Sequence, residues 1–351
     1  MKKIILLICL LFITGCNYIE LNDMGIVTMM AIKYHNNNYE ITIEMKENIK
    51  DDDETSIIHT SIGPTIEKTL QNLELTTDKT LYFIDLNVIL IDEETINNKL
   101  SNIVDYLTRD VSFGTNYNII IDNNIDDTLK LMEEKHKNTG NYLKNIFNNK
   151  DNNLINLKYD NFLKDSLNEF KDVILPLGQI KDNEYIINKA VIFNNQKIVS
   201  QIELEDIQIY NLLTNIKSEY YFNINYHNKN LVYRVSTHSS KINYQNNTIN
   251  INIKLNGSFI EIEDTNLLNE EDLQKILSIL NNTIKTNITN LIYTLKIYNS
   301  DILNFKKYYY NEKRTKITTI KNLNYQINID LNLNREGLIF NSIGEMYEKA
   351  R

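Results

Sequence analysis

Strict alternation of apolar and polar residues in the second half of the chain most constrains its fold. The alternation runs without a break from Ile249 to Leu255, and again from Tyr325 to Leu333. Because successive side chains of a strand point to opposite faces, each stretch predicts a strand with one face on a core and the other in water. Such half-buried strands are typical of antiparallel sheets, so we expect one here.

A long amphipathic helix is predicted between these two strands. Apolar residues recur there every three or four positions, at Leu273, Ile276, Leu277, Leu280, Ile284, Ile288, Leu291, Ile292 and Leu295. This spacing gives the helix one continuous apolar face, and Asn269 with Asp272 resembles a capping box at its start. At a rise of 1.5 Å per residue, the helix would be about 40 Å long.

The first half of the chain alternates between strand and helix patterns. Strands are predicted at Ile26–Ile32, Tyr39–Met45, Leu81–Ile91 and Tyr117–Ile121, and helices at Pro64–Leu75 and Glu93–Thr108. Leu81–Ile91 is the most apolar of these stretches and is therefore expected to be a central strand. The alternation predicts a mixed sheet that is covered by helices.

The amino terminus has the pattern of a lipoprotein signal peptide. Met1-Lys2-Lys3 is basic, Ile4–Ile13 is apolar, and Thr14-Gly15-Cys16 follows. The apolar run is too short to span a bilayer, and Ile13-Thr14-Gly15-Cys16 fits the bacterial lipobox. We expect cleavage before Cys16 and thioether lipidation of that residue. Two or three acyl chains, palmitate among them, would anchor the protein durably, since each buried methylene contributes about 0.8 kcal/mol.

The length and the turn residues predict several domains. At 351 residues the chain exceeds what one compact core usually serves. We expect a signal peptide at 1–15, an amino-terminal α/β domain at 16–123, a helical middle segment or subdomain at 124–175 and a carboxy-terminal α+β domain at 176–345. The fold class is α+β, with several domains, mixed or antiparallel sheets flanked by helices, and a long helix in the carboxy-terminal domain.

Charge and cysteine content exclude several function classes. The net charge of −9 includes Lys2 and Lys3, so removal of the signal peptide would leave about −11. An acidic chain of this kind disfavours nucleic acid as a partner. Cys9 would leave with the signal peptide and Cys16 would carry lipid, so disulfides and cysteine metal sites are not expected.

One stretch resembles a calcium-binding loop. Asp122, Asn124, Asp126 and Glu133 occupy positions 1, 3, 5 and 12 of that pattern. Position 6 is Asp127 where the loop needs glycine for a left-handed turn. The alternative, which we favour, is a strand followed by a helix that Asp126 caps. The prediction is therefore no metal, with these four residues as a weak calcium candidate.

No other pattern in the sequence indicates catalysis. A nucleophile elbow and a phosphate-binding glycine loop are both missing, so we predict no catalytic residues and no cofactor. A basic and aromatic cluster, Lys306–Tyr310 with Lys313, Arg314 and Lys316, has two interpretations. It would contact headgroups or an acidic partner, or it is a helix end whose tyrosines pack while its lysines meet solvent.

Several short motifs, in their order along the chain, resemble one family. They are Tyr18–Asp23 leading to Gly25–Thr28, Asp105–Asp110, Asn188–Phe193 followed by Gln196–Val199, Leu295–Ile302, and Arg335-Glu336-Gly337. Behind a lipobox, this series resembles the Ger(x)C family of spore germination lipoproteins, the C subunits of GerA-type nutrient germinant receptors.

The resemblance implies a receptor subunit that has no enzymatic activity. Such a subunit lies on the outer face of the spore inner membrane, held by its lipid anchor. It assembles with a membrane-embedded A subunit and a transporter-like B subunit to trigger spore germination. Whether it contacts the small-molecule germinant is left open. The alternative is a lipid-anchored solute-binding protein or surface hydrolase, since these classes share the lipobox.

Overall fold

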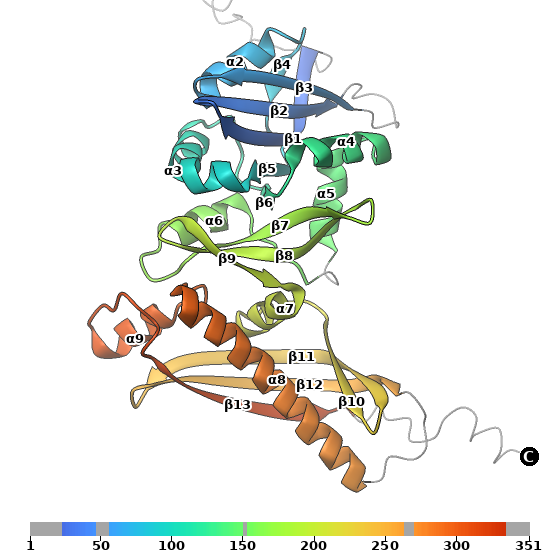
Figure 1. Cartoon of the computed structure of the whole chain (residues 1–351), viewed down its shortest axis with the longest axis vertical. Coiled ribbons are helices and arrows are strands. Elements are labelled where there is room, and N and C mark those ends of the chain that lie inside the picture. The colour runs from blue at the N-terminus through green and yellow to red at the C-terminus, as the bar shows by residue number, and fades with distance from the viewer. Residues whose placement is uncertain (1–22, 47–55, 150–152, 263–269, 335–351) are drawn as a thin grey trace, which may run out of the picture.

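The computed structural model is an elongated molecule in which two β-sheets follow one another along the long axis (Figure 1). It describes residues 23–46, 56–149, 153–262 and 270–334. The lipobox with Cys16, the capping residue Asn269 and the motif Arg335-Glu336-Gly337 lie outside these ranges. The predicted α+β class, with sheets flanked by helices and a long helix near the carboxyl end, is confirmed.

The first sheet has nine strands and a mixed topology. Its main order is β3-β2-β1-β5-β6-β7-β8-β9, and β4 pairs with β1 off this path. Pairs β1–β5, β5–β6 and β6–β7 are parallel, whereas both ends of the sheet are antiparallel. The strands are β1 (Met24–His35), β2 (Asn38–Lys46), β3 (Ser56–Gly63), β4 (Thr80–Tyr82), β5 (Val88–Asp92), β6 (Asn118–Asp122), β7 (Ile174–Lys181), β8 (Glu184–Asn194) and β9 (Lys197–Glu203).

Helices cover both faces of this sheet. On one face are α2 (Ile66–Glu74), α3 (Glu93–Arg109) and α6 (Tyr159–Ser166), and on the other are α4 (Ile125–Lys135) and α5 (Thr139–Asn148). The central strands supply both cores: in β1, Met30 and Ile32 face the first group while Met29 and Ala31 face the second. Strands that are buried on both faces read as continuous apolar runs, which explains the sequence pattern.

The prediction of a single strand over Leu81–Ile91 is wrong, because the chain turns in the middle of this range. Leu86 donates its backbone N–H to the carbonyl of Phe83 (3.1 Å), and the side chain of Ile84 is 84% exposed. The two resulting pieces, β4 and β5, pair in parallel with successive segments of β1. Two short strands, β4 and β5, therefore pair with different parts of the one long strand β1. The apolar run in the sequence does not show where one strand ends and the next begins.

The second sheet has four strands in the order β10-β11-β12-β13. Its elements are α7 (Leu204–Leu213), β10 (Tyr220–Tyr226), β11 (Lys229–Gln245), β12 (Thr248–Ile262), α8 (Glu270–Tyr298), α9 (Phe305–Lys313) and β13 (Asn324–Leu333). The first three strands are antiparallel, as predicted, whereas β13 is parallel to β12. Helices α8 and α9 carry the chain back between these strands, and such a crossover connection is what a parallel pair requires.

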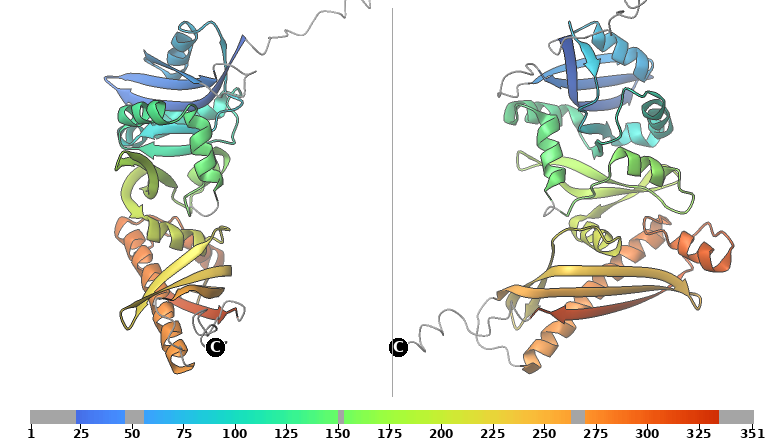
Figure 2. Two further views of the ribbon diagram at one scale, coloured as in Figure 1. Left: turned by 90° about the vertical axis from the view of Figure 1, so that its right-hand side faces the viewer. Right: turned by 180° about the vertical axis from the view of Figure 1, so that it is seen from behind.

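Helix α8 is the predicted long helix and has 29 residues. It crosses one face of the second sheet (Figure 2). Ile276, Leu280, Ile284, Ile288 and Leu291 are fully buried, as the spacing predicts. Among the described residues, no helix is both long and apolar enough to cross a membrane.

One continuous core joins the two sheets. It contains Ile174, Ala190 and Ile192 from the first sheet, residues of α7, and the inner faces of α8 and the second sheet. The predicted domain boundary at residue 176 falls inside β7, a strand of the first sheet. The division at 123, 175 and 345 stays a prediction.

Asparagine occurs in every two-residue hairpin turn of the described strands that has positive φ angles. Five two-residue hairpin turns have both central residues at positive φ: Asn36-Asn37, Asp182-Asn183, Asn195-Gln196, His227-Asn228 and Asn246-Asn247. These are the dihedral angles of type I′ turns, whose twist matches that of the flanking strands, and asparagine tolerates them better than most residues. The turn at Asn36-Asn37 joins β1 to β2 in an antiparallel hairpin.

Candidate functional site

The structure gives the four calcium-candidate residues separate roles. Asp122 is buried at the end of β6, whereas Glu133 is exposed on α4. Asp126 Oδ1 accepts a hydrogen bond from Lys33 Nζ (2.6 Å), and Asn124 Oδ1 accepts one from the backbone N–H of Asp127 (3.2 Å). Helix α4 begins at Ile125, so positions 4 to 12 of the supposed loop are helical and do not wrap around an ion.

The expectation that Asp126 caps this helix is wrong, because the N-cap is Asn124. Its side chain satisfies an amide of the first turn, as an N-cap residue does. Within the described part of the chain, no three His, Cys, Asp or Glu residues are grouped so as to hold a metal ion.

Asp122 instead connects its own strand, β6, to strand β8 and to helix α4. Its carboxylate accepts hydrogen bonds from Tyr185 Oη on β8 (2.9 Å), from Thr128 Oγ1 on α4 (3.1 and 3.2 Å) and from the backbone N–H of Asn124 (2.8 Å). Burial raises the pKa of Asp122, while these three donors act in the opposite direction. Gly178 pairs with Asp122 across the sheet, and a Cβ there would overlap the Tyr185 hydroxyl, so glycine makes room for this contact.

A second buried carboxylate, Glu44 on β2, holds the start of α5. Oε1 accepts hydrogen bonds from the backbone N–H of Thr139 (2.6 Å) and from Ser56 Oγ (2.9 Å). Oε2 accepts them from the backbone N–H of Gly140 (2.8 Å) and from Thr28 Oγ1 (2.8 Å). A negative charge is favourable at a helix amino terminus, and here it satisfies two of the free amides of the first turn.

The sequence does not single out Glu44, because it alternates with apolar residues in the predicted strand Tyr39–Met45, as a solvent-facing residue does. In the structure, both faces of β2 are buried from Ile41 to Met45, and the amino terminus of α5 is hydrogen-bonded to Glu44. The only sequence signal is a glutamate between Ile43 and Met45, and an exposed glutamate gives the same signal. Its partners at Thr139 and Gly140 are about 95 residues away.

Asp301 forms a third buried polar cluster, at the junction of the two sheets. Its carboxylate accepts backbone N–H groups of Phe305 (2.8 Å) and Lys306 (2.7 Å) at the start of α9. Its backbone exchanges two hydrogen bonds with Asp172, which precedes β7: the Asp301 N–H donates to Asp172 Oδ2 (2.7 Å), and the Asp172 N–H donates to the Asp301 carbonyl (3.0 Å). Lys306 Nζ lies 3.5 Å from Asp172 Oδ2.

Neighbouring groups extend this junction. Ser300 Oγ donates to the carbonyl of Phe193 at the end of β8 (2.6 Å), and Asn194 Nδ2 donates to the carbonyl of Tyr298 (3.2 Å). The end of α8 and the loop after it are thus bonded to β8 and to the segment that precedes β7. These contacts, with the shared core, fix the second sheet against the first.

Asp301 is expected to make stability depend on pH. Burial raises the pKa of Asp301 to about 6, although the two backbone donors and Lys306 lower it. Because this pKa lies above the unfolded value of about 3.9, the folded state binds more protons between these pH values. The contribution of Asp301 to the free energy of unfolding therefore falls as pH rises from 4 to 6, by about 2 kcal/mol.

The variant Asp301→Asn keeps the shape of the side chain and does not titrate. When the pH falls from 7 to 4, wild type should gain about 2 kcal/mol in the free energy of unfolding relative to this variant. Urea titrations followed by tyrosine fluorescence at each pH measure the difference. If the free energy of unfolding changes equally with pH in the two proteins, Asp301 is not the source of this pH dependence.

The basic and aromatic cluster lies on α9 and the loop that follows it. Tyr308 and Tyr309 pack against the core of the second sheet, and the ring of Tyr310 lies 5.1 Å from that of Phe170. Lys316 Nζ pairs with Glu169 (2.6 Å). The prediction that the tyrosines pack is confirmed. Lys306 departs from the expected exposure, because its side chain is only 12% exposed beside Asp172.

The protein is thus an α+β protein in which two sheets share a core and buried carboxylates hydrogen-bond to distant elements. Comparison with known proteins identifies its family. The model "Spore germination protein N-terminal domain" matches residues 17–180, and "Spore germination B3/ GerAC like, C-terminal" matches residues 188–337. The chain belongs to this family of spore germination proteins, the Ger(x)C family.

A solved structure shares the fold. The crystal structure of the GerBC protein aligns with a TM-score of 0.59 at 13% sequence identity, covering 87% of this chain and 96% of that one. At this identity the likeness concerns the fold alone. No curated protein matches the sequence significantly.

Proposed function

We propose that this protein is a lipid-anchored subunit of a nutrient germinant receptor and that it acts by assembly and not by catalysis. The observation that carries the proposal is the match of both family models, in order, along most of the chain. The first model begins at residue 17, directly after Cys16 of the lipobox. The exported part of the protein would then be the two family domains, attached to the membrane through a lipid on Cys16.

Its partners in this proposal are the membrane-embedded A subunit and the transporter-like B subunit. Family membership supports a receptor complex at the outer face of the spore inner membrane. The rival class, solute-binding proteins, normally has repeated parallel βαβ units in two lobes around a hinge. Here the second sheet has three antiparallel strands, and a shared core joins it to the first sheet. This arrangement favours the receptor subunit over a hinged binding protein.

Deletion of the gene tests the proposal. Spores that lack the protein should fail to germinate with the nutrient that this receptor recognises, because an incomplete receptor does not signal. Germination triggered by calcium dipicolinate, which needs no nutrient, should be unchanged and serves as the control. Loss of optical density after each trigger measures both responses. Normal germination of the deletion strain across a panel of amino acids, sugars and nucleosides would contradict the proposal.

A further inference from the structure

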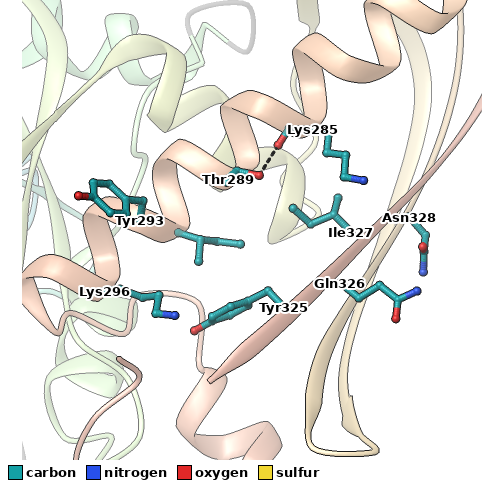
Figure 3. Close-up of a pocket in the computed structure, with 9 residues that line it drawn as sticks. Lys285, Thr289, Tyr293, Lys296, Tyr325, Gln326, Ile327 and Asn328 are labelled. Carbon is teal, nitrogen blue, oxygen red and sulfur yellow. Dashed lines mark hydrogen bonds between the residues drawn. The ribbon is translucent and has the colours of Figure 1, made fainter. Parts of the chain in front are cut away.

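A groove runs between helix α8 and strand β13 (Figure 3). Its volume is 480 Å³, and its walls include Lys285, Thr289 and Tyr293 from the helix and Gln326 and Asn328 from the strand. Hydrogen bonds join helix and strand near both ends. Asn281 Nδ2 donates to the carbonyl of Ile329 (3.3 Å), and Lys296 Nζ donates to the carbonyl of Leu323 (3.1 Å).

The distance between these two bonds sets the length of the groove. Fifteen residues of helix separate Asn281 from Lys296, or about 22 Å. Six residues separate Leu323 from Ile329, or about 20 Å of extended chain. The groove is therefore as long as a strand of about six residues.

The strand that borders the groove is at the end of its sheet. β13 pairs with β12 on one side, and the described strands provide no partner on the other. The N–H of Asn334 donates to the carbonyl of Gly257 (2.8 Å), so even-numbered residues of β13 direct their backbone groups to β12. Along a strand, the backbone N–H and C=O groups of successive residues point alternately to the two neighbouring strand positions. The odd-numbered Tyr325 and Ile327 therefore direct these groups away from β12, toward the groove.

The surface around the groove is apolar and positively charged. Tyr293 and Ile297, one turn apart on α8, are 66% and 48% exposed. Between Ile276 and Tyr298 the only charged residues are Lys285 and Lys296, although the whole chain has a net charge of −9. In Figure 3 the labelled lysines both lie along the helix side of the groove. β13 carries one charge, Asp330, which follows Ile329 at the closed end.

We propose that an extended acidic segment of a partner protein binds in this groove by adding a strand to the open edge of β13. Backbone hydrogen bonds to Tyr325 and Ile327 would hold the segment, as in other cases of strand addition. Its alternate apolar side chains would lie on Tyr293, which lines the groove, and its carboxylates would pair with Lys285 and Lys296. This inference concerns the surface itself and does not depend on the receptor assignment.

The test uses the full chain in a mild detergent and a fluorescein-labelled heptapeptide that alternates isoleucine and glutamate. Fluorescence anisotropy should show a dissociation constant of about 10 to 100 μM. The same peptide with lysine in place of glutamate should bind at least about tenfold more weakly. Lys285→Glu should weaken binding of the acidic peptide by about tenfold, since Lys285 is exposed and its replacement leaves the fold intact.

Lys241→Glu provides the matched control, because the same charge change then lies on β11, two strands from β13. It should leave the affinity nearly unchanged. Strand addition is tested separately by N-methylating the amides of alternate peptide residues, first one set and then the other. Only the set that faces β13 should abolish binding.

Three results of the peptide-binding experiments would overturn the inference. They are equal affinity for the acidic and basic peptides, equal effects of Lys285→Glu and Lys241→Glu, and no binding below 1 mM peptide. Self-association of the chain that Tyr293→Ala abolishes, seen by sedimentation, would assign the groove to a second copy and so would also overturn it. Circular dichroism of each variant confirms that the fold is retained.

Discussion

Replacement of Cys16 by alanine is expected to move the protein from the membrane fraction to the soluble fraction. Each buried methylene of an acyl chain contributes about 0.8 kcal/mol, so two chains give effectively permanent attachment and their loss removes it. Fractionation of membranes followed by immunoblotting measures the change. Labelling with palmitate gives a second readout, since the variant has no thiol at the lipobox to modify.

Cys9→Ala is the matched control for this experiment. It makes the same chemical change within the apolar run Ile4–Ile13, seven residues before the lipobox cysteine. It should keep both the palmitate label and the membrane location. If Cys16→Ala loses the label and still remains in the membrane fraction after a high-salt wash, other contacts hold the protein and the lipid is not its principal anchor.

Replacement of Glu44 by leucine is expected to give the largest loss of stability. The substitution leaves the buried amides of Thr139 and Gly140 without an acceptor. It also removes the carboxylate that accepts from the hydroxyls of Thr28 and Ser56, which keep only the backbone carbonyls of residue 44 (3.4 Å) and Lys137 (2.7 Å) as acceptors. Each unsatisfied buried donor costs about 1 to 3 kcal/mol, and partial relaxation should leave a net loss of about 3 to 5 kcal/mol. Urea denaturation followed by far-ultraviolet circular dichroism measures it.

Two further variants make this result specific. Glu44→Gln keeps one acceptor oxygen and should lose about 2 kcal/mol, between wild type and the leucine variant. Glu133→Leu makes the same change at an exposed position of α4 and should stay within about 0.5 kcal/mol of wild type. A Glu44→Leu protein as stable as Glu133→Leu would show that the buried carboxylate does not hold α5.

The spacing of apolar residues in the sequence predicted the helices and strands that bury one face and expose the other. The alternation in Ile249–Leu255 and the apolar face of Leu273–Leu295 were sufficient, because one face of each element meets water and the other meets a core. The break between β4 and β5 was not predictable in this way, since both pieces are apolar and the turn at Ile84 depends on pairing with β1. The parallel direction of β13 likewise depends on the path of α8 and α9.

The buried carboxylates were harder to predict than the fold. Asp122 was singled out for its spacing to Asn124 and Asp126, yet its partner Tyr185 is 63 residues away and forms no local motif with it. Glu44 and Asp301 depend on backbone amides, which every residue except proline possesses. A side chain that accepts hydrogen bonds from distant backbone amides forms no recognisable sequence motif with them. These contacts are therefore visible only in the folded structure.

Isolation of the protein with its neighbours tests whether it is a subunit of a germinant receptor. A carboxy-terminal tag on the protein, mild cross-linking of spore membranes and mass spectrometry of the purified material identify its partners. A receptor subunit should be recovered with two multi-span membrane proteins, the A and B subunits, in comparable amounts, and these should be lost in the Cys16→Ala strain. Recovery of the protein alone, or with the components of an ATP-driven solute transporter, would contradict it.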